Sequence, residues 1–187
     1  MKTLRHTMAS LLMLTAASFP LTGLGDELGE ASISQADGRF VAHTEVMIAL
    51  PVHKVRAILT DYRNLARLNP SIKTVDILAR GAGGKVRMQV VSQSCVLFFC
   101  RGYRWVQDVI TLPSGDIIAR VDPARSDFRA GWTRYRLLPE AGKTRLVFDA
   151  DLVGDFELPS GIGAWMVKRK LLDESYALAR NVEEFGG

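Results

Sequence analysis

The chain has 187 residues, of which 48% are apolar and 24% are charged, a composition typical of one globular domain large enough to bury a core. The formal net charge is +4, and Lys2 and Arg5 account for half of it. The other basic residues are scattered along the chain, so this small excess does not indicate a nucleic-acid-binding protein.

The N-terminus has the pattern of an export signal. A basic lead with Lys2 and Arg5 precedes the apolar stretch "MASLLMLTAASF" (8–19), which ends in small residues. This stretch is too short to cross a bilayer, which takes about 20 apolar residues as a helix. We therefore expect a signal peptide over residues 1–25 and a periplasmic or secreted protein, with a retained anchor helix or a disordered start as the alternative.

The next segments lead into the main domain, which we place at residues 39–187. Residues 26–38, "DELGEASISQADG", are polar and predict a linker. The run "FVAHTEVMIAL" (40–50) predicts a strand, and Pro51 after it suits the first turn of a helix. Apolar residues then recur at helical spacing, at Val52, Val55, Ile58 and Leu59.

The remainder predicts an antiparallel sheet followed by one long helix. Short β-type runs separated by Gly- or Pro-containing turns indicate consecutive hairpins. We expect strands at 72–78, 85–93, 103–112, 116–121, 128–138 and 144–154. Beyond them the apolar period becomes helical over 160–185 and covers a wide arc, so this helix needs a broad surface to lie on.

Two segments resemble a known superfamily. The segment "ALPVHKVRAILTDYRNLARLNPSIKTVDIL" (49–78) resembles the opening of START-like domains of the polyketide cyclase/dehydrase and coenzyme Q-binding branch. The segment "GWTRYRLLPEAGKTRLVFDADL" (131–152) resembles the paired late strands of that branch. The resemblance implies an α+β helix-grip fold, in which a curved antiparallel sheet of about six to seven strands wraps around a long C-terminal helix. Members of the superfamily include lipid carriers, quinone binders, cyclases and a ribosome-associated toxin.

A curved sheet that closes on one helix leaves a hollow when its inward side chains are of modest size. Such pockets are mostly apolar and bind small apolar molecules. We therefore expect a tunnel for a hydrophobic small molecule or lipid, with core packing as the alternative role of its lining. The expected ligand-binding residues are Val86, Met88, Val90, Tyr103, Trp105, Trp132, Phe148, Trp165, Met166 and Tyr176.

The sequence contains no strong catalytic constellation. The histidines His6, His43 and His53 do not pair by spacing with a cysteine or a carboxylate, so we predict no metal site and no cofactor. Asp149 and Asp151 share one face of a strand, opposite its apolar residues, and are expected in solvent. We assign no catalytic residue.

A few polar residues would meet a ligand if their strand faces are interior. His43 and Glu45 share one face, and Arg134 and Arg136 share another with Trp132. An arginine in an apolar tunnel needs an anionic or hydrogen-bonding partner, which could be a ligand headgroup or a neighbouring acid. An enzyme would require a general acid or base here, and the candidates are Glu45, His43, Tyr103 and Tyr176.

The stretch "QSCVLFFCRG" (93–102) contains both cysteines, Cys95 and Cys100. In a continuous strand their Cα atoms would lie about 16 Å apart, too far for a disulfide. If the chain reverses between them, they face each other across a hairpin. The strand-like flanks and the expected oxidising compartment favour the disulfide-closed hairpin.

That hairpin would place four apolar residues, Val96, Leu97, Phe98 and Phe99, at its tip. An apolar tip needs cover, which the tunnel mouth, a membrane surface, a partner or the short helices could supply. The leading interpretation is an exported, non-enzymatic binder or carrier of a lipid or similar molecule. The alternatives are a polyketide cyclase/dehydrase-like enzyme and a protein-interaction module.

Overall fold

The computed structural model describes residues 30–96, 99–154 and 164–187. Its strands and helices follow one another in the order that the superfamily resemblance implies. The elements are β1 (Ala31–Ala36), β2 (Arg39–Ile48), α1 (Val52–Leu59), α2 (Leu65–Leu68), β3 (Ile72–Arg80), β4 (Val86–Val96), β5 (Phe99–Thr111), β6 (Ile117–Asp122), β7 (Phe128–Glu140), β8 (Lys143–Gly154) and α3 (Ala164–Gly186).

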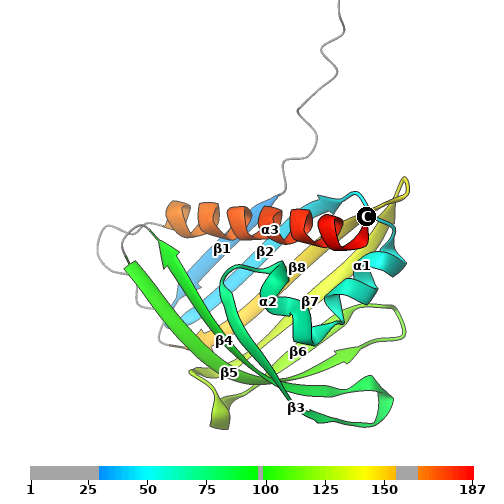
Figure 1. Cartoon of the computed structure of the whole chain (residues 1–187). Coiled ribbons are helices and arrows are strands. Elements are labelled where there is room, and N and C mark those ends of the chain that lie inside the picture. Colours follow the sequence, from blue (N-terminus) through cyan, green and yellow to red (C-terminus); the bar gives the residue numbers. More distant parts are fainter. Residues whose placement is uncertain (1–29, 97–98, 155–163) are drawn as a thin grey trace, which may run out of the picture.

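The strands form one curved antiparallel sheet of eight strands in the order β1-β2-β8-β7-β6-β5-β4-β3. Six of its seven pairings join strands consecutive in sequence, and the seventh joins β2 to β8. Because β1 and β3 are not paired with each other, the sheet stays open. The predicted helix-grip fold is confirmed, but its strand count is eight rather than six to seven (Figure 1).

The additional strand is β1, which lies within the expected linker at 26–38. Its residues pair with β2 from Ala31↔Thr44 to Ala36↔Arg39. The turn between them is Asp37-Gly38, and both residues have positive φ, 49° and 71°. An Asp-Gly pair in this conformation is the strongest short-range hairpin signal, and the polar composition of the segment concealed it.

Helix α3 lies across the mouth of the curved sheet. It contacts β1 and β2 at one end of the strand order and β4 near the other, together with α1 and α2. Figure 1 shows the red and orange helix running above the strands, with the cyan helices α1 and α2 within the curve. The expected helix at 160–185 is confirmed from residue 164 onward, and residues 160–163 lie outside the described residues.

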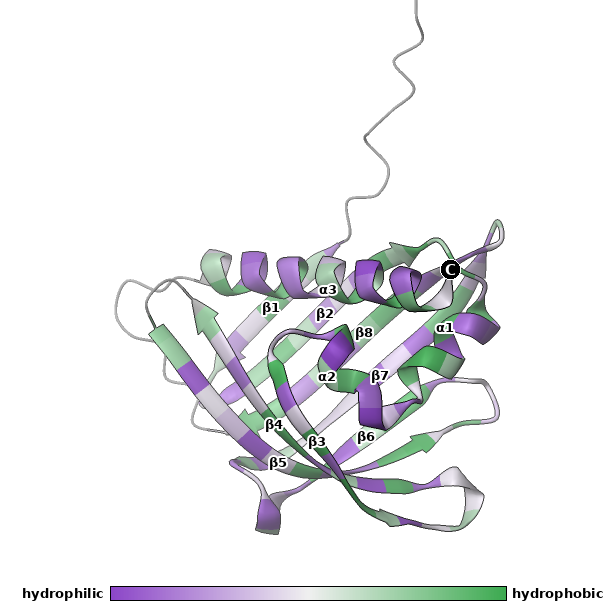
Figure 2. Cartoon of the chain, viewed as in Figure 1, coloured by the Kyte–Doolittle hydropathy of each residue, from purple (hydrophilic) through white to green (hydrophobic). Residues whose placement is uncertain are grey.

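Alternation along the strands separates two faces of the sheet. On β4, Val86, Met88 and Val90 are buried, while the residues between them are partly exposed. Figure 2 shows hydrophobic and hydrophilic segments alternating along several strands. The inward face supplies a core that the buried residues Val55, Leu59 and Val182 of α1 and α3 complete.

The chain reverses between the two cysteines, as predicted. Cys95 of β4 pairs with Cys100 of β5, and the two are joined by a disulfide with Cα atoms 4.0 Å apart. The alternative of a continuous buried strand through 93–102 is therefore wrong. Within the described part of the chain, no helix has the length and apolar character needed to span a membrane.

Candidate ligand-binding cavity

A cavity of about 320 Å³ lies between the concave face of the sheet and the three helices. Its volume is within the range typical of small-molecule sites. The walls are mostly apolar and come from strands β2 and β4 to β8, the β3 start, and all three helices. The arrangement is therefore a candidate site for an apolar molecule.

A row of small residues crosses the sheet beneath the cavity. The register aligns Ala42 with Ala150, Ala150 with Thr133, and Thr133 with Ala119, on the adjacent strands β2, β8, β7 and β6. All four line the cavity. Side chains this short do not reach the helices, so the hollow follows from residue size at one level of the sheet.

Bulky residues stand on one side of this row. Two positions along the strands from the small residues, Phe148 of β8 pairs with Tyr135 of β7, and Tyr135 pairs with Ile117 of β6. The rings of Tyr135 and Phe148 have centroids 4.8 Å apart. On the other side, Phe128 lines the cavity and packs on Trp105, with centroids 5.6 Å apart. Aromatic walls on both sides bound the hollow.

The helix contributes one stripe to the ceiling. Leu171, Glu174, Ser175 and Leu178 of α3 line the cavity, at spacings of three and four residues. Ser175 donates to the Leu171 carbonyl at 2.9 Å and lies 3.2 Å from the Thr44 hydroxyl of β2. The contact with Thr44 turns this stripe of α3 toward the sheet.

Glu174 is the one acidic or basic side chain among the cavity-lining residues that the structure describes. It accepts hydrogen bonds from the hydroxyls of Ser71, before β3, and Ser94 of β4, the latter at 3.0 Å. Lys170, one helical turn away, places its ammonium 3.3 Å from the same carboxylate. This polar group joins the helix to the β3–β4 side of the sheet and marks one end of the cavity as polar.

The two tyrosines that line the cavity, Tyr62 and Tyr135, differ in the hydrogen bonding of their hydroxyls. Burial raises the pKa of Tyr62, which also has a hydrogen bond to Thr111 that acts in the opposite direction. Burial alone raises the pKa of Tyr135 to about 12. No hydrogen-bond partner of the Tyr135 hydroxyl is found among the described residues, so it stays protonated and able to donate.

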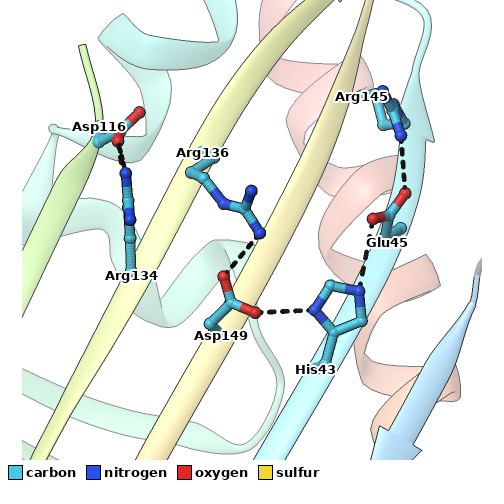
Figure 3. Close-up of polar contacts among 7 residues, drawn as sticks. All are labelled: His43, Glu45, Asp116, Arg134, Arg136, Arg145 and Asp149. Carbon is cyan, nitrogen blue, oxygen red and sulfur yellow. Dashed lines mark hydrogen bonds and ion pairs between the residues drawn. The ribbon is translucent and has the colours of Figure 1, made fainter. Parts of the chain in front are cut away.

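The outer face of the sheet carries a network of ion pairs instead of a ligand site. Asp149 lies 2.7 Å from the Nδ1 atom of His43 and accepts a hydrogen bond from Arg136 at 3.0 Å. The carboxylate of Glu45 lies 3.4 Å from the Nε2 atom of His43 and 3.0 Å from Arg145. Figure 3 shows these side chains together, with a separate pair between Arg134 and Asp116.

The network perturbs its central carboxylate. Burial raises the pKa of Asp149, but hydrogen bonds from His43 and Arg136 oppose this effect and the pKa is lowered overall. On the same face, Asp151 pairs with Arg39, and that hydrogen bond lowers the pKa of Asp151. Both arginines that we considered for a ligand headgroup have an acid as partner, Asp116 for Arg134 and Asp149 for Arg136.

Residues 39–183 match the sequence profile of the family described as "Polyketide cyclase / dehydrase and lipid transport". This match spans most of the chain. The chain belongs to the polyketide cyclase/dehydrase and lipid transport family. No curated protein sequence matches it significantly.

Solved structures show the same fold. A START superfamily protein from Mycobacterium smegmatis has 21% identity and a TM-score of 0.60, with 78% of this chain and 96% of that chain covered. The Zhui aromatase/cyclase from Streptomyces sp. R1128 has 19% identity and a TM-score of 0.60, with 79% and 93% covered. A STAR-related lipid transfer protein from Xanthomonas axonopodis has 12% identity and a TM-score of 0.53, with 83% and 97% covered.

Four of the ten residues that we expected at a ligand line the cavity of this family member. They are Met88, Val90, Trp105 and Phe148. Val86 is buried in the core, and Tyr103 is outside the lining but stacks on the lining residue Phe128, with centroids 5.4 Å apart. Met166 and Tyr176 of α3 are half-buried outside the lining, and Tyr176 packs on the core.

Trp132 lies on the outer face, where it is 37% exposed, and not on the inward face that we expected. The reason is a β-bulge on β7, where Phe128 pairs with Gly154 but Ala130 pairs with Val153. The extra residue reverses the alternation, so Phe128 faces inward while Trp132 faces outward. Arg134 and Arg136 follow Trp132 to the outer face.

Trp165 is 65% exposed and does not face the sheet. The apolar arc of α3 is wide enough for two neighbouring stripes, and the expectation followed the one with the larger aromatic side chains. The stripe that faces the cavity contains Leu171 and Leu178, with the buried Val182 further along. Glu174 interrupts this stripe, and no apolar pattern could have identified it.

Besides the start of the C-terminal helix, two predictions fall on residues outside the described ranges. The signal peptide at 1–25 is one, and it stays a prediction. The apolar tip is the other, because Leu97 and Phe98 lie outside those ranges, while its last residue, Phe99, is half-buried. Among the described residues, no group of histidine, cysteine and acidic side chains is placed to hold a metal ion.

Proposed function

We propose that the protein is an exported binder or carrier of a hydrophobic small molecule or lipid, held between the sheet and α3. The observation that supports this most directly is the mostly apolar cavity above the row of small residues. The family description names lipid transport, and a structure of the same fold is titled a lipid transfer protein.

Binding has more support than catalysis. The candidate acids and bases Glu45 and His43 lie on the outer face, and Tyr103 and Tyr176 do not line the cavity. The family also includes polyketide cyclases and dehydrases by its description, and the Zhui structure is titled an aromatase/cyclase. The titratable groups in the described lining are Tyr62, Tyr135 and Glu174, and the carboxylate of Glu174 is engaged by two serines and a lysine.

Export is supported by the signal-like N-terminus and by the Cys95–Cys100 disulfide, since such bonds persist in oxidising compartments. Expression of the full chain, followed by fractionation and intact-mass measurement, tests this part. We expect the protein outside the cytoplasm, shortened at its N-terminus and oxidised. Recovery of the full-length, reduced chain in the cytoplasm would contradict export.

The binding proposal is tested by native mass spectrometry of protein purified from its own host, then by titration of the delipidated protein with N-phenyl-1-naphthylamine. We expect a co-purifying apolar molecule and saturable binding of the fluorescent probe. Ala150→Phe fills the row of small residues and should reduce probe affinity at least about tenfold, because the ring occupies the space the probe needs. Ala130→Phe is the matched control, since Ala130 is exposed on the outer face of β7.

Equal probe affinity in the wild type and in Ala150→Phe would remove the cavity as the binding site. Failure of the delipidated wild type to bind any apolar probe would remove the proposed function.

A further inference from the structure

We infer that the cavity selects an uncharged ligand with a hydrogen-bond-accepting oxygen, which the Tyr135 hydroxyl holds. This inference rests on the proposed function and specifies the class of ligand. It follows from two features of the lining, a tyrosine hydroxyl with no hydrogen-bond partner among the described residues and the absence of a cation among the described lining residues.

Tyr135 is placed at the inner wall of the cavity by its neighbours. It pairs with Ile117 on β6 and with Phe148 on β8, and both of these residues also line the cavity. The Tyr135 side chain is partly exposed, and because the residue lines the cavity we assign its accessible surface to the cavity. A ligand in the hollow would therefore contact it.

The hydroxyl has no hydrogen bond to a described residue, and burial keeps it protonated. A ligand in the cavity shields this hydroxyl from water, and leaving it unpaired there would be costly. A ligand carbonyl, ether or hydroxyl oxygen would accept its hydrogen bond. Tyr62 offers a contrast, because it also lines the cavity but its hydroxyl bonds to Thr111.

The charges of the lining exclude a buried anion. Glu174 is negative, and no arginine or lysine is among the described residues that line the cavity. Lys170 already neutralises Glu174 from outside the lining. A carboxylate or phosphate beside Tyr135 would be buried without a counter-ion, which costs far more than a single hydrogen bond returns.

Several other polar lining groups are already engaged within the protein. The indole of Trp105 donates to Gln107 at 3.0 Å, and Ser175 bonds to the Leu171 carbonyl. Ser71 and Ser94 donate to Glu174. A ligand that placed its acceptor beside one of these groups would compete with an existing bond, so the Tyr135 position is favoured over them.

Three probes of matched shape test the inference by calorimetric titration of the delipidated protein at pH 7.5. They are 2-ethylnaphthalene, 2-acetonaphthone and 2-naphthoate, which carry no acceptor, a neutral acceptor and an anion. We expect the ketone to bind about tenfold more tightly than the hydrocarbon, and the carboxylate to bind at least about tenfold more weakly than the ketone.

Two variants with matched controls assign the effect. Tyr135→Phe should reduce the preference for the ketone over the hydrocarbon to about twofold or less, while the hydrocarbon binds as before. Tyr62→Phe should retain the full preference. Glu174→Gln should strengthen binding of the carboxylate, and Glu184→Gln, exposed on the same helix, should not.

Two outcomes would overturn the inference. One is a ketone preference that persists in Tyr135→Phe, and the other is a carboxylate that binds the wild type as tightly as the ketone. Binding of the hydrocarbon with no preference among the three probes leaves the proposed function intact and removes only the inference. Absence of binding by all three, and by N-phenyl-1-naphthylamine, counts against the proposed function itself.

Discussion

The imidazole of His43 lies between the carboxylates of Asp149 and Glu45, at 2.7 Å and 3.4 Å, on the outer face of the sheet. The three groups come from β2 and β8, adjacent strands that belong to the N-terminal and C-terminal parts of the chain. Arg136 and Arg145 continue the network on either side. The cluster therefore ties adjacent strands together and stands apart from the cavity.

Asp149 should make stability depend on acid pH. Its pKa is lower in the folded protein than in the unfolded chain, so its stabilising contribution is present above the ordinary aspartate pKa of about 4 and is lost as the pH falls through the folded value. In Asp149→Asn, the unfolding free energy at pH 7 should decrease and its fall between pH 5 and pH 3 should become smaller. Urea titrations at several pH values measure both effects.

Asp76→Asn is the control for this prediction, because Asp76 is exposed on β3 and has no ion pair among the described contacts. An identical acid dependence in Asp149→Asn and the wild type would contradict the assigned role of the network.

Glu45→Gln and His43→Ala should leave ligand binding unchanged, since neither residue lines the cavity. Both should reduce stability modestly, because exposed and half-exposed ion pairs contribute about 1 kcal/mol or less. Titration with N-phenyl-1-naphthylamine and thermal unfolding separate the two effects. A loss of probe affinity at unchanged stability would place the ligand site on the outer face instead.

Removal of the disulfide should destabilise the protein. The bond closes a loop of only a few residues, for which chain entropy predicts about 2 kcal/mol. The double variant Cys95→Ser/Cys100→Ser should melt about 4–8 °C lower than the oxidised wild type. Both cysteines are exposed, so a reductant should lower the wild-type melting temperature to that of the variant. A melting temperature insensitive to reductant would show that the bond does not stabilise the fold.

Gly131→Ala should destabilise the bulged part of β7. Gly131 has φ of 155°, and a Cβ atom there would lie 2.6 Å from Leu152 Cδ2 and 2.8 Å from the Asp151 carbonyl oxygen. A strained backbone of this kind costs about 1–3 kcal/mol. Gly102→Ala on β5 is the control, because its added Cβ would meet only the Ser92 carbonyl oxygen, at 3.5 Å. Equal melting temperatures for the two variants would contradict the strain.

The order of elements was predictable from sequence because period and turn residues are local signals. The helical spacing after Pro51, the alternation of 85–93 and the hairpin at the cysteines all depend on residues close together in the chain. The first strand was missed because its residues are polar, although Asp37-Gly38 is a local hairpin signal that could have identified it. Polar edge strands are common, since one edge faces solvent.

The cavity lining was only partly predictable because it depends on register. Met88 and Val90 follow from alternation within one strand, whereas Trp132 was misplaced by a bulge that shows only in the pairing of β7 with β8. The row from Ala42 to Ala119 joins residues far apart in sequence, so no single segment reveals it. Glu174 is visible in sequence as an ordinary helix acid, and only its contact with Ser71 and Ser94 gives it a place in the site.

Across the described residues, every hydrogen bond that joins α3 to the rest of the molecule involves a side chain on at least one partner, as in Ser71 to Glu174 and Asn181 to the Leu68 carbonyl. The backbone ladders of the sheet do not include the helix. Consequently α3 is attached to the sheet by side-chain contacts, while the strands below the cavity are joined to one another by continuous backbone hydrogen bonds. A tilt of α3 would therefore break side-chain contacts and leave the backbone ladders of the sheet intact.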